Sequence, residues 1–91
     1  GNPDAKVTVI EYASATCPHC AEFHNDIWPA IKKDYVDTGK VFFIFREMPT
    51  DNMAVAAFML MRCVPDENYF PAIAQLFREQ QLWMKTKPKR L

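Results

Sequence analysis

The sequence feature that most restricts the fold is a strand–helix–strand pattern in the first fifty residues. Residues 6–13 (KVTVIEYA) and 40–47 (KVFFIFRE) are rich in β-branched and aromatic types, so each is predicted to be a strand. Both segments are too apolar for a strand with one solvated face, and we expect both to be buried, the first at the centre of a sheet. A helical pattern lies between them. The sequence therefore predicts a βαβ unit with a parallel strand pair and a right-handed crossover.

The helix of this unit is predicted to begin at a pair of cysteines and to end before residue 40. Pro18 suits the first helical turn, where its missing N–H costs nothing. Pro29 falls inside the pattern and is expected to kink the helix or to divide it in two. Gly39 suits a left-handed cap that closes the helix. One apolar stripe is expected along the helix, formed by Cys20, Phe23, Ile27, Ile31 and Tyr35.

Two further helices are predicted after the second strand. The first covers about 51–64, and Cys63 is expected to be a small buried side chain on its apolar face. That face is predicted to contain Met53, Ala56, Ala57, Leu60, Cys63 and Val64. The second covers roughly 67–83 and shows Tyr69, Phe70, Ile73, Leu76, Phe77 and Trp83 at helical spacing. The fold class is therefore predicted to be α/β.

The length and charge of the chain bound its organisation and its partners. With 91 residues we expect one domain, divided into a strand–helix–strand part (1–50), a helical part (51–84) and a basic tail (85–91). Eleven basic and eleven acidic side chains cancel, so the chain lacks the charge of a nucleic-acid binder. Its apolar runs are far shorter than the roughly 20 residues that a membrane helix needs. The polar start GNPDAK has no signal-peptide pattern, and we expect that such a signal was removed.

Two cysteines stand two residues apart in the segment SATCPHCAEFH (14–24). Cys17 is predicted at the N-terminus of the helix, where unpaired backbone N–H groups and the helix dipole favour negative charge on its sulfur. His19 adds a positive charge or a hydrogen-bond donor nearby. Because the thiolate is the reactive form, Cys17 is the candidate nucleophile, and the core-facing Cys20 is the candidate resolving thiol. A stabilised thiolate makes the Cys17–Cys20 disulfide a stronger oxidant, which favours a disulfide donor.

A metal site is the main alternative for the cysteine pair. Structural zinc commonly takes four ligands from two short-spaced pairs, whereas this chain has three cysteines and one such pair. His24 and Cys63 would have to complete the set, but we expect His24 on the helix surface and Cys63 in an apolar face. A c-type haem needs a histidine directly after Cys20, and that residue is Ala21. We therefore prefer the redox pair.

Glu11 interrupts the first apolar strand six residues before Cys17. One interpretation is a carboxylate that faces outward or pairs with Arg46 on the second strand. The other is a buried acid beneath the cysteine pair, which passes protons to or from Cys20 during exchange. The residues alone leave both interpretations open.

The segment VIEYASATCPHC, followed by a helix, by KVFFIFREMP and by two more helices, resembles the DsbA-like thiol–disulfide oxidoreductases of the thioredoxin superfamily. The resemblance implies a thioredoxin-like fold, a periplasmic location and a mixed disulfide at Cys17. It favours Glu11 as a proton-handling residue and places Pro18 and His19 in the redox motif. It implies no cofactor beyond the Cys17–Cys20 disulfide. The implied partners are reduced or unfolded exported proteins as substrates and a membrane-bound partner that reoxidises the pair.

The resemblance covers nearly all 91 residues, but these match only the first half of a family member. The family pattern continues with a β-hairpin that starts with a cis-proline facing the cysteines. No proline has that context here, among Pro3, Pro29, Pro49, Pro65, Pro71 and Pro88. We expect an incomplete domain whose uncovered sheet edge invites dimerisation or a swap, and a poor catalyst in isolation. A disulfide isomerase or reductase of the same fold, and a small zinc-binding or interaction module, remain as alternatives.

Overall fold

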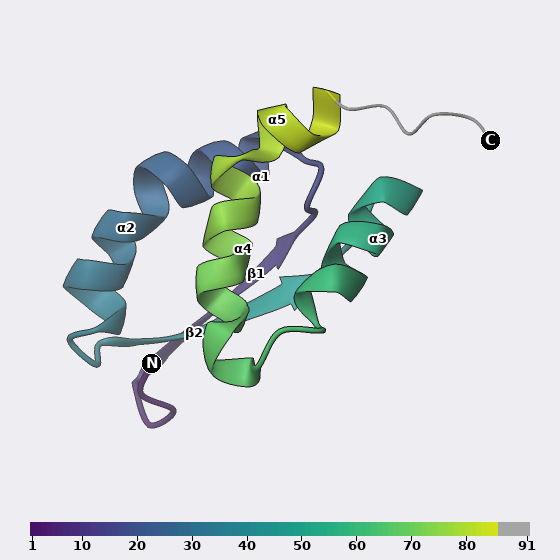
Figure 1. The fold of residues 1–91 in the computed structure, drawn as a ribbon. Helices are drawn as coiled ribbons and strands as arrows, with labels where there is room; N and C mark the ends of the chain where they lie inside the picture. Colours follow the sequence, from purple (N-terminus) through teal and green to yellow (C-terminus); the bar gives the residue numbers. More distant parts are fainter. Residues whose placement is uncertain (86–91) are drawn as a thin grey trace.

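The computed structural model describes residues 1–85, in which two parallel strands are followed and covered by helices (Figure 1). Strand β1 (Val7–Ala13) pairs with β2 (Val41–Glu47), with Val7 opposite Val41 and Ala13 opposite Glu47. The predicted parallel βαβ unit is confirmed. The helical elements are α1 (Pro18–Glu22), the π-helical turn η1 (Phe23–Ile27), α2 (Trp28–Ile31), a second π-helical turn η2 (Lys32–Val36), α3 (Asn52–Met61), the 3₁₀ turn η3 (Asp66–Asn68), α4 (Tyr69–Arg78) and α5 (Gln80–Lys85).

The crossover between the strands is one helical segment that bends between α1 and α2 (Figure 1). The turn η1 between them directly precedes α2, whose second residue is Pro29. Proline has no N–H, and its ring crowds the preceding turn. The chain widens that turn. The backbone N–H of Trp28 reaches back five residues to the carbonyl of Phe23, which makes η1 a π-helical turn. Of the two outcomes expected at Pro29, the structure therefore has the kink.

The π-helical turns also change which side chains face the sheet. A bond that spans five residues adds one residue to a turn, so the inward positions move along the chain. Ile27 and Tyr35, which the sequence placed in the apolar stripe, are each 50% exposed. His24, Trp28 and Val36 face inward instead, and Val36 is buried. The predicted stripe is therefore wrong at Ile27 and Tyr35, whereas Ile31 is half-buried as expected.

The end of the crossover helix follows the prediction. Gly39 has a φ of 80°, a left-handed conformation that a residue without Cβ adopts at little cost. Its N–H donates to the carbonyl of Val36 at 3.0 Å, and the N–H of Lys40 donates to Tyr35 at 3.0 Å. These two bonds form the Schellman arrangement, which satisfies the last helical carbonyls and turns the chain into β2.

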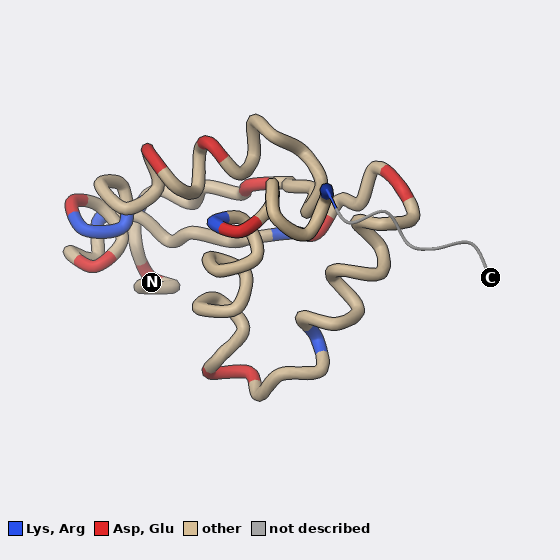
Figure 2. The backbone as a smooth tube through the Cα atoms, turned by 45° about the horizontal axis from the view of Figure 1, so that its top comes forward, with Lys and Arg blue, Asp and Glu red and all other residues tan. Residues whose placement is uncertain are grey.

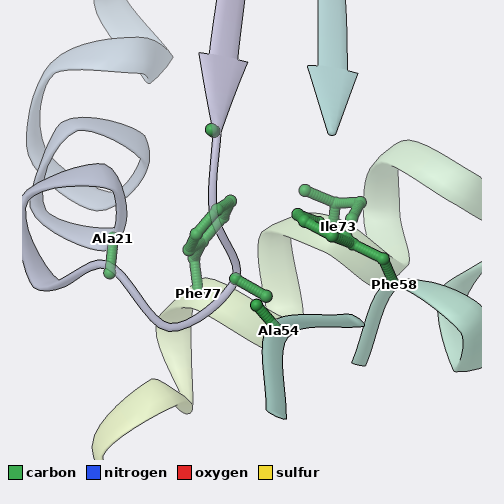
Figure 3. Close-up of a cluster of buried hydrophobic side chains, with 7 residues drawn as sticks. Ala21, Ala54, Phe58, Ile73 and Phe77 are labelled. Carbon is green, nitrogen blue, oxygen red and sulfur yellow. The ribbon is translucent and has the colours of Figure 1, made fainter. Parts of the chain in front are cut away.

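The hydrophobic core lies at the carboxyl ends of the two strands (Figure 3). Phe77 and Ile73 from α4 and Phe58 from α3 meet small side chains from the strand end, the following loop and α1. Those small residues are Ala13, Ala15, Ala21 and Ala54, the last of them from α3 itself. Burying side chains the size of phenylalanine contributes about 2–3 kcal/mol each. The loop after β1 is therefore enclosed by the best-packed part of the molecule.

Strand β1 is exposed over most of its length by contrast. Val7, Val9, Ile10 and Tyr12 of β1 are all exposed. Among residues 1–85, β1 pairs with β2 and with no further strand. The expectation of a buried central strand is therefore wrong for the part of the chain that the structure describes, because no other layer covers this face or this edge.

The apolar face predicted for the third helix is partly wrong as well. Asp51 caps α3 by accepting the N–H of Ala54 at 2.8 Å, and the helix buries Ala54 and Phe58. Cys63, expected to be buried, is exposed just beyond the end of α3. The reason is a shift of the buried face by one or two positions, which a helix that is apolar all round permits. Most of the predicted basic tail, with Lys87, Lys89 and Arg90, lies outside the described residues.

Charged residues of both signs are interspersed along the described chain (Figure 2). No helix within residues 1–85 combines the length and the apolar character that crossing a bilayer requires.

Candidate redox site

The loop between β1 and α1 brings the cysteine motif to the carboxyl end of the parallel pair. Cys17 is the N-cap residue of α1, with extended backbone angles of −76° and 118°, and Pro18 occupies the first helical position. The N–H of Cys17 donates to the carbonyl of Ser14 at 3.2 Å, and its own carbonyl accepts the first helical bond from Ala21 at 3.2 Å. The predicted position of Cys17 at the helix start is confirmed.

Hydrogen bonds fix this loop to the connection between β2 and α3. Ser14 and Thr16 are both buried, and every buried polar side chain needs a partner. The Ser14 hydroxyl lies 2.9 Å from that of Thr50, and the Thr16 hydroxyl donates to Asp51 at 3.1 Å. Since Asp51 also caps α3, the start of α3 and the loop before Cys17 are held by one polar network.

Both cysteines are free thiols, and their pKa values are shifted in opposite directions. The backbone N–H of Cys20 is the largest influence on Cys17, and it lowers the pKa of Cys17 below its ordinary value of 9.0. Burial of the sulfur opposes this effect, and the backbone N–H of His19 adds to it. For Cys20, burial is the largest influence and raises its pKa, and the negative charges of Cys17 and Glu11 raise it further. One thiol is therefore prepared to ionise and its partner to keep a proton.

The two residues between the cysteines face solvent. Pro18 is exposed, and the side chain of His19 is 93% exposed. The His19 ring lies 4.0 Å from Glu22 one turn along, a distance at which two solvated groups interact weakly. The influence of His19 on Cys17 in this structure comes through its backbone N–H.

Glu11 is half-buried on β1, and its carboxylate is bound by His24. The Nε2 atom of His24 lies 2.9 and 3.1 Å from the two carboxylate oxygens, and the two side chains are 7% and 15% exposed. Arg46, the partner considered from the sequence, is exposed. The prediction of His24 as a helix-surface residue is wrong, because His24 stands four residues after Cys20 and therefore on the same inner face of the helix.

Aromatic rings enclose His24. Its ring stacks on Phe77 of α4 with centroids 4.6 Å apart, and Phe45 of β2 meets it edge-on at 5.6 Å. Such contacts fix the orientation of an imidazole and exclude water from it. The spacing of four residues from Cys20 to His24, and from His24 to Trp28, was the sequence signal that would have placed His24 inside.

The sequence also gave no indication of Gln80, the first residue of α5. Its side chain is buried and donates to the carbonyls of Ala15 at 2.9 Å and Cys17 at 3.0 Å. A polar residue at the start of a short helix has no local pattern that predicts such a contact sixty residues away.

The residues considered for zinc are not brought together. His24 is bound to Glu11, and Cys63 is exposed beyond α3. Within residues 1–85, no three side chains of His, Cys, Asp or Glu are grouped as the ligands of a metal ion would be.

Comparison with known proteins identifies the class. The family model described as thioredoxin matches residues 1–91, and the chain belongs to this family. A putative protein-disulfide oxidoreductase of Rickettsia bellii is 41% identical over 81 residues, which are 89% of this chain and 31% of that protein. The chain spans about a third of the length of the curated relatives it matches.

Two solved structures agree with this assignment. The crystal structure of Wolbachia pipientis alpha-DsbA1 is 43% identical, with a TM-score of 0.84, over 91% of this chain and 42% of that one. A protein-disulfide isomerase from Novosphingobium aromaticivorans is 30% identical, with a TM-score of 0.89, over 93% of this chain and 43% of that one. The predicted thioredoxin-like α/β fold and the predicted resemblance to DsbA-like proteins are confirmed.

Proposed function

We propose that the chain carries the redox site of a protein-disulfide oxidoreductase that donates the Cys17–Cys20 disulfide to other proteins. The observation that carries this proposal is the placement of two free cysteines in the first turn of α1, where backbone N–H groups lower the pKa of Cys17 and burial raises the pKa of Cys20. A lowered pKa makes Cys17 a good nucleophile and a good leaving group, and it stabilises the reduced pair. Stabilisation of the reduced pair makes the disulfide oxidising.

In the donating direction, a substrate thiolate attacks the sulfur of Cys17. The Cys17–Cys20 bond breaks, its electron pair goes to Cys20, and a mixed disulfide joins Cys17 to the substrate. A second substrate thiolate then attacks the substrate sulfur of this mixed disulfide, and Cys17 leaves as a thiolate. The substrate has lost two electrons and gained a disulfide, and the pair has gained both electrons.

The Cys20 sulfur must gain a proton in the first step and lose it when the pair is reoxidised. Its raised pKa favours the protonated thiol once the disulfide is open. We assign the handling of this proton to Glu11, whose charge acts on Cys20 and whose carboxylate is held by His24. Pro18 starts the helix without a surplus N–H, and His19, exposed beside Cys17, is in a position to meet the substrate.

The partners follow from the same chemistry. Reduced or unfolded exported proteins supply the substrate thiols, and the periplasm is the compartment in which their disulfides persist. A membrane-bound partner reoxidises the pair. The exposed apolar residues of β1 support self-association through the uncovered edge, by pairing with a second copy of the chain or by exchange of a segment.

A redox titration in glutathione buffers tests the proposal. Free thiols are trapped at each buffer composition, and the state of Cys17 and Cys20 is read by mass. We expect the pair to remain reduced until the buffer is oxidising. A Cys17–Cys20 disulfide that persists in strongly reducing buffer would contradict a donor and would indicate a reductase or a structural bridge.

An isomerase is the second candidate, because the Novosphingobium aromaticivorans structure bears that name. An isomerase is kept reduced, whereas a donor is kept oxidised. The resting state of the pair in protein trapped directly from cells distinguishes the two, with a disulfide expected for the donor.

A further inference from the structure

The side chain of Gln80 reaches from α5 into the loop that carries the nucleophile. Helix α5 lies beside α1 at the carboxyl end of the sheet (Figure 1), and the Gln80 side-chain amide donates to two carbonyls there. One belongs to Ala15 at 2.9 Å and the other to Cys17 at 3.0 Å. A primary amide has two N–H groups, so each carbonyl receives its own hydrogen.

These two carbonyls lie on either side of Thr16 and set the path of the chain into α1. The Cys17 carbonyl also accepts the N–H of Ala21, which is the first hydrogen bond of the helix. Gln80 therefore holds the same peptide group that begins α1. The position of that group relative to the next turn decides how the N–H groups of His19 and Cys20 approach the Cys17 sulfur.

The contact has no substitute in water. Gln80 is 4% exposed and Ala15 is fully buried, so solvent cannot replace the amide at the Ala15 carbonyl. A buried carbonyl that loses its donor keeps the full cost of desolvation, and the local backbone moves to relieve it. The neighbouring Gln81 has the same side chain but is exposed, which offers a matched comparison.

We propose that Gln80 is a positioning residue for the Cys17 nucleophile, acting through the carbonyls of Ala15 and Cys17 to hold the helix start against its sulfur. The inference rests on the proposed function, in which Cys17 is the reacting sulfur. It makes the last described helix part of the redox site, although that helix begins 63 residues after Cys17. The reactivity of the thiol therefore depends on whether α5 is docked.

The test compares Gln80→Met with Gln81→Met, both in a Cys63→Ala background that removes the exposed third thiol. Methionine keeps the length of glutamine and removes both donors. The fully reduced chain is titrated by the ultraviolet absorbance of the thiolate, and alkylation followed by fragment mass analysis assigns the first transition to Cys17. The melting temperature is recorded on the same samples.

We expect Gln80→Met to raise the titration midpoint of Cys17 by about half a pH unit, and Gln81→Met to leave it unchanged. Since one unit corresponds to a tenfold change, the glutathione equilibrium should move about threefold toward the disulfide. A purely structural role would lower the melting temperature and leave the midpoint where it was. That result would overturn the proposal.

A second variant covers the case in which Gln80→Met does not fold. Gln80→Asn keeps the amide but is one methylene too short to reach both carbonyls, so a smaller upward shift is expected, and an unchanged midpoint overturns the proposal equally. The titration needs no substrate protein. A failure of disulfide donation with a shifted midpoint would therefore contradict the proposed function while supporting the positioning role.

Discussion

Each strand of the sheet carries a glutamate bound by side chains from the helices, and the two clusters differ in what surrounds them. Glu11 on β1 is bound by His24, whose ring is enclosed by Phe77 and Phe45. Glu47 on β2 is 12% exposed and accepts from Arg62 at 2.7 Å and from the Tyr69 hydroxyl at 2.5 Å, but the Arg62 side chain is 71% exposed.

The difference lies in the partner rather than in the glutamate. An enclosed partner cannot be replaced by water, so the charge of Glu11 acts at short range in a medium of low polarity and reaches Cys20. A solvated partner is screened and exchangeable, so the charge of Glu47 is confined to its own cluster. Burial raises the pKa of Tyr69, and its bond to Glu47 adds to the increase. We therefore expect the first cluster to control chemistry and the second to affect stability alone.

The largest difference between the two clusters is expected when His24 or Arg62, the partner of each glutamate, is removed. His24→Ala leaves Glu11 buried without a donor and empties the space between Phe45 and Phe77, so we expect a loss of about 3 kcal/mol in the free energy of unfolding. Arg62→Ala leaves Glu47 with Tyr69 and with water, and should cost under about 1 kcal/mol. Urea denaturation of the reduced protein measures both. Equal losses would show that enclosure of the partner is unimportant.

Removal of the negative charge of each glutamate should affect the rate of reoxidation at Glu11 and not at Glu47. Glu11→Gln keeps an oxygen for His24 but cannot accept the Cys20 proton, so we expect reoxidation by glutathione disulfide to slow about 10–100-fold at the resolving step. Accumulation of glutathione-modified Cys17, followed by mass spectrometry, reports that step. Glu47→Gln is the matched control and should react at the parent rate. A parent rate for Glu11→Gln would remove Glu11 from the mechanism.

The sequence predicted the positions of the strands and helices better than it predicted which of their side chains are buried. The strands at 6–13 and 40–47, the helix start at Cys17 and the cap at Gly39 each depend on neighbours in sequence, and all four are confirmed. These features come from backbone preferences and turn chemistry, which a short segment contains in full.

The inner face of the crossover helix could not be predicted in the same way. A regular repeat of 3.6 residues placed Ile27 and Tyr35 inside, and two π-helical turns move both of them to the surface. The contact of Gln80 with the motif depends on how α5 docks, and the exposure of Val7 depends on which layers are present. Such facts belong to tertiary packing, and no local pattern carries them.

A smaller effect is expected from removal of the Tyr69 hydroxyl, the second partner of Glu47. Tyr69→Phe removes the hydroxyl that donates to Glu47 and should lower the free energy of unfolding by about 1 kcal/mol. The glutathione equilibrium of the cysteine pair should not change. A shift in that equilibrium would mean that the second cluster also reaches the redox site.

The smallest expected effect is on the titration of Cys20. The negative charge of Glu11 raises the pKa of Cys20, so Glu11→Gln should lower its midpoint by a few tenths of a pH unit. Burial, the larger cause, remains in both variants, so only the part of the increase that comes from the charge of Glu11 should disappear. Alkylation rates of Cys20 against pH in a Cys17→Ala background measure the shift, and Glu47→Gln again serves as the control. An upward shift of the Cys20 midpoint in Glu11→Gln would contradict the conclusion that the charge of Glu11 raises the pKa of Cys20.

The same raised pKa makes the stability of the reduced protein depend on pH. The folded state holds the Cys20 proton more tightly than the unfolded state does, so this contribution is complete below pH 9.0 and is lost as the pH rises through the folded value. The lowered pKa of Cys17 acts in the opposite sense, since its contribution is complete above pH 9.0 and is lost as the pH falls through the folded value.

The π-helical turn η1 contains one residue more than a regular helical turn. An α-helix advances about 100° and about 1.5 Å for each residue. Deletion of one residue within Phe23–Ile27 would therefore restore a regular turn and leave the helix after it pointing in nearly the same direction relative to Cys20. Deletion of one residue from the regular turn of α1 would instead rotate everything after it by that angle, and α2 would lose its packing on the sheet. The helix should thus tolerate a shorter η1 far better than a shorter α1.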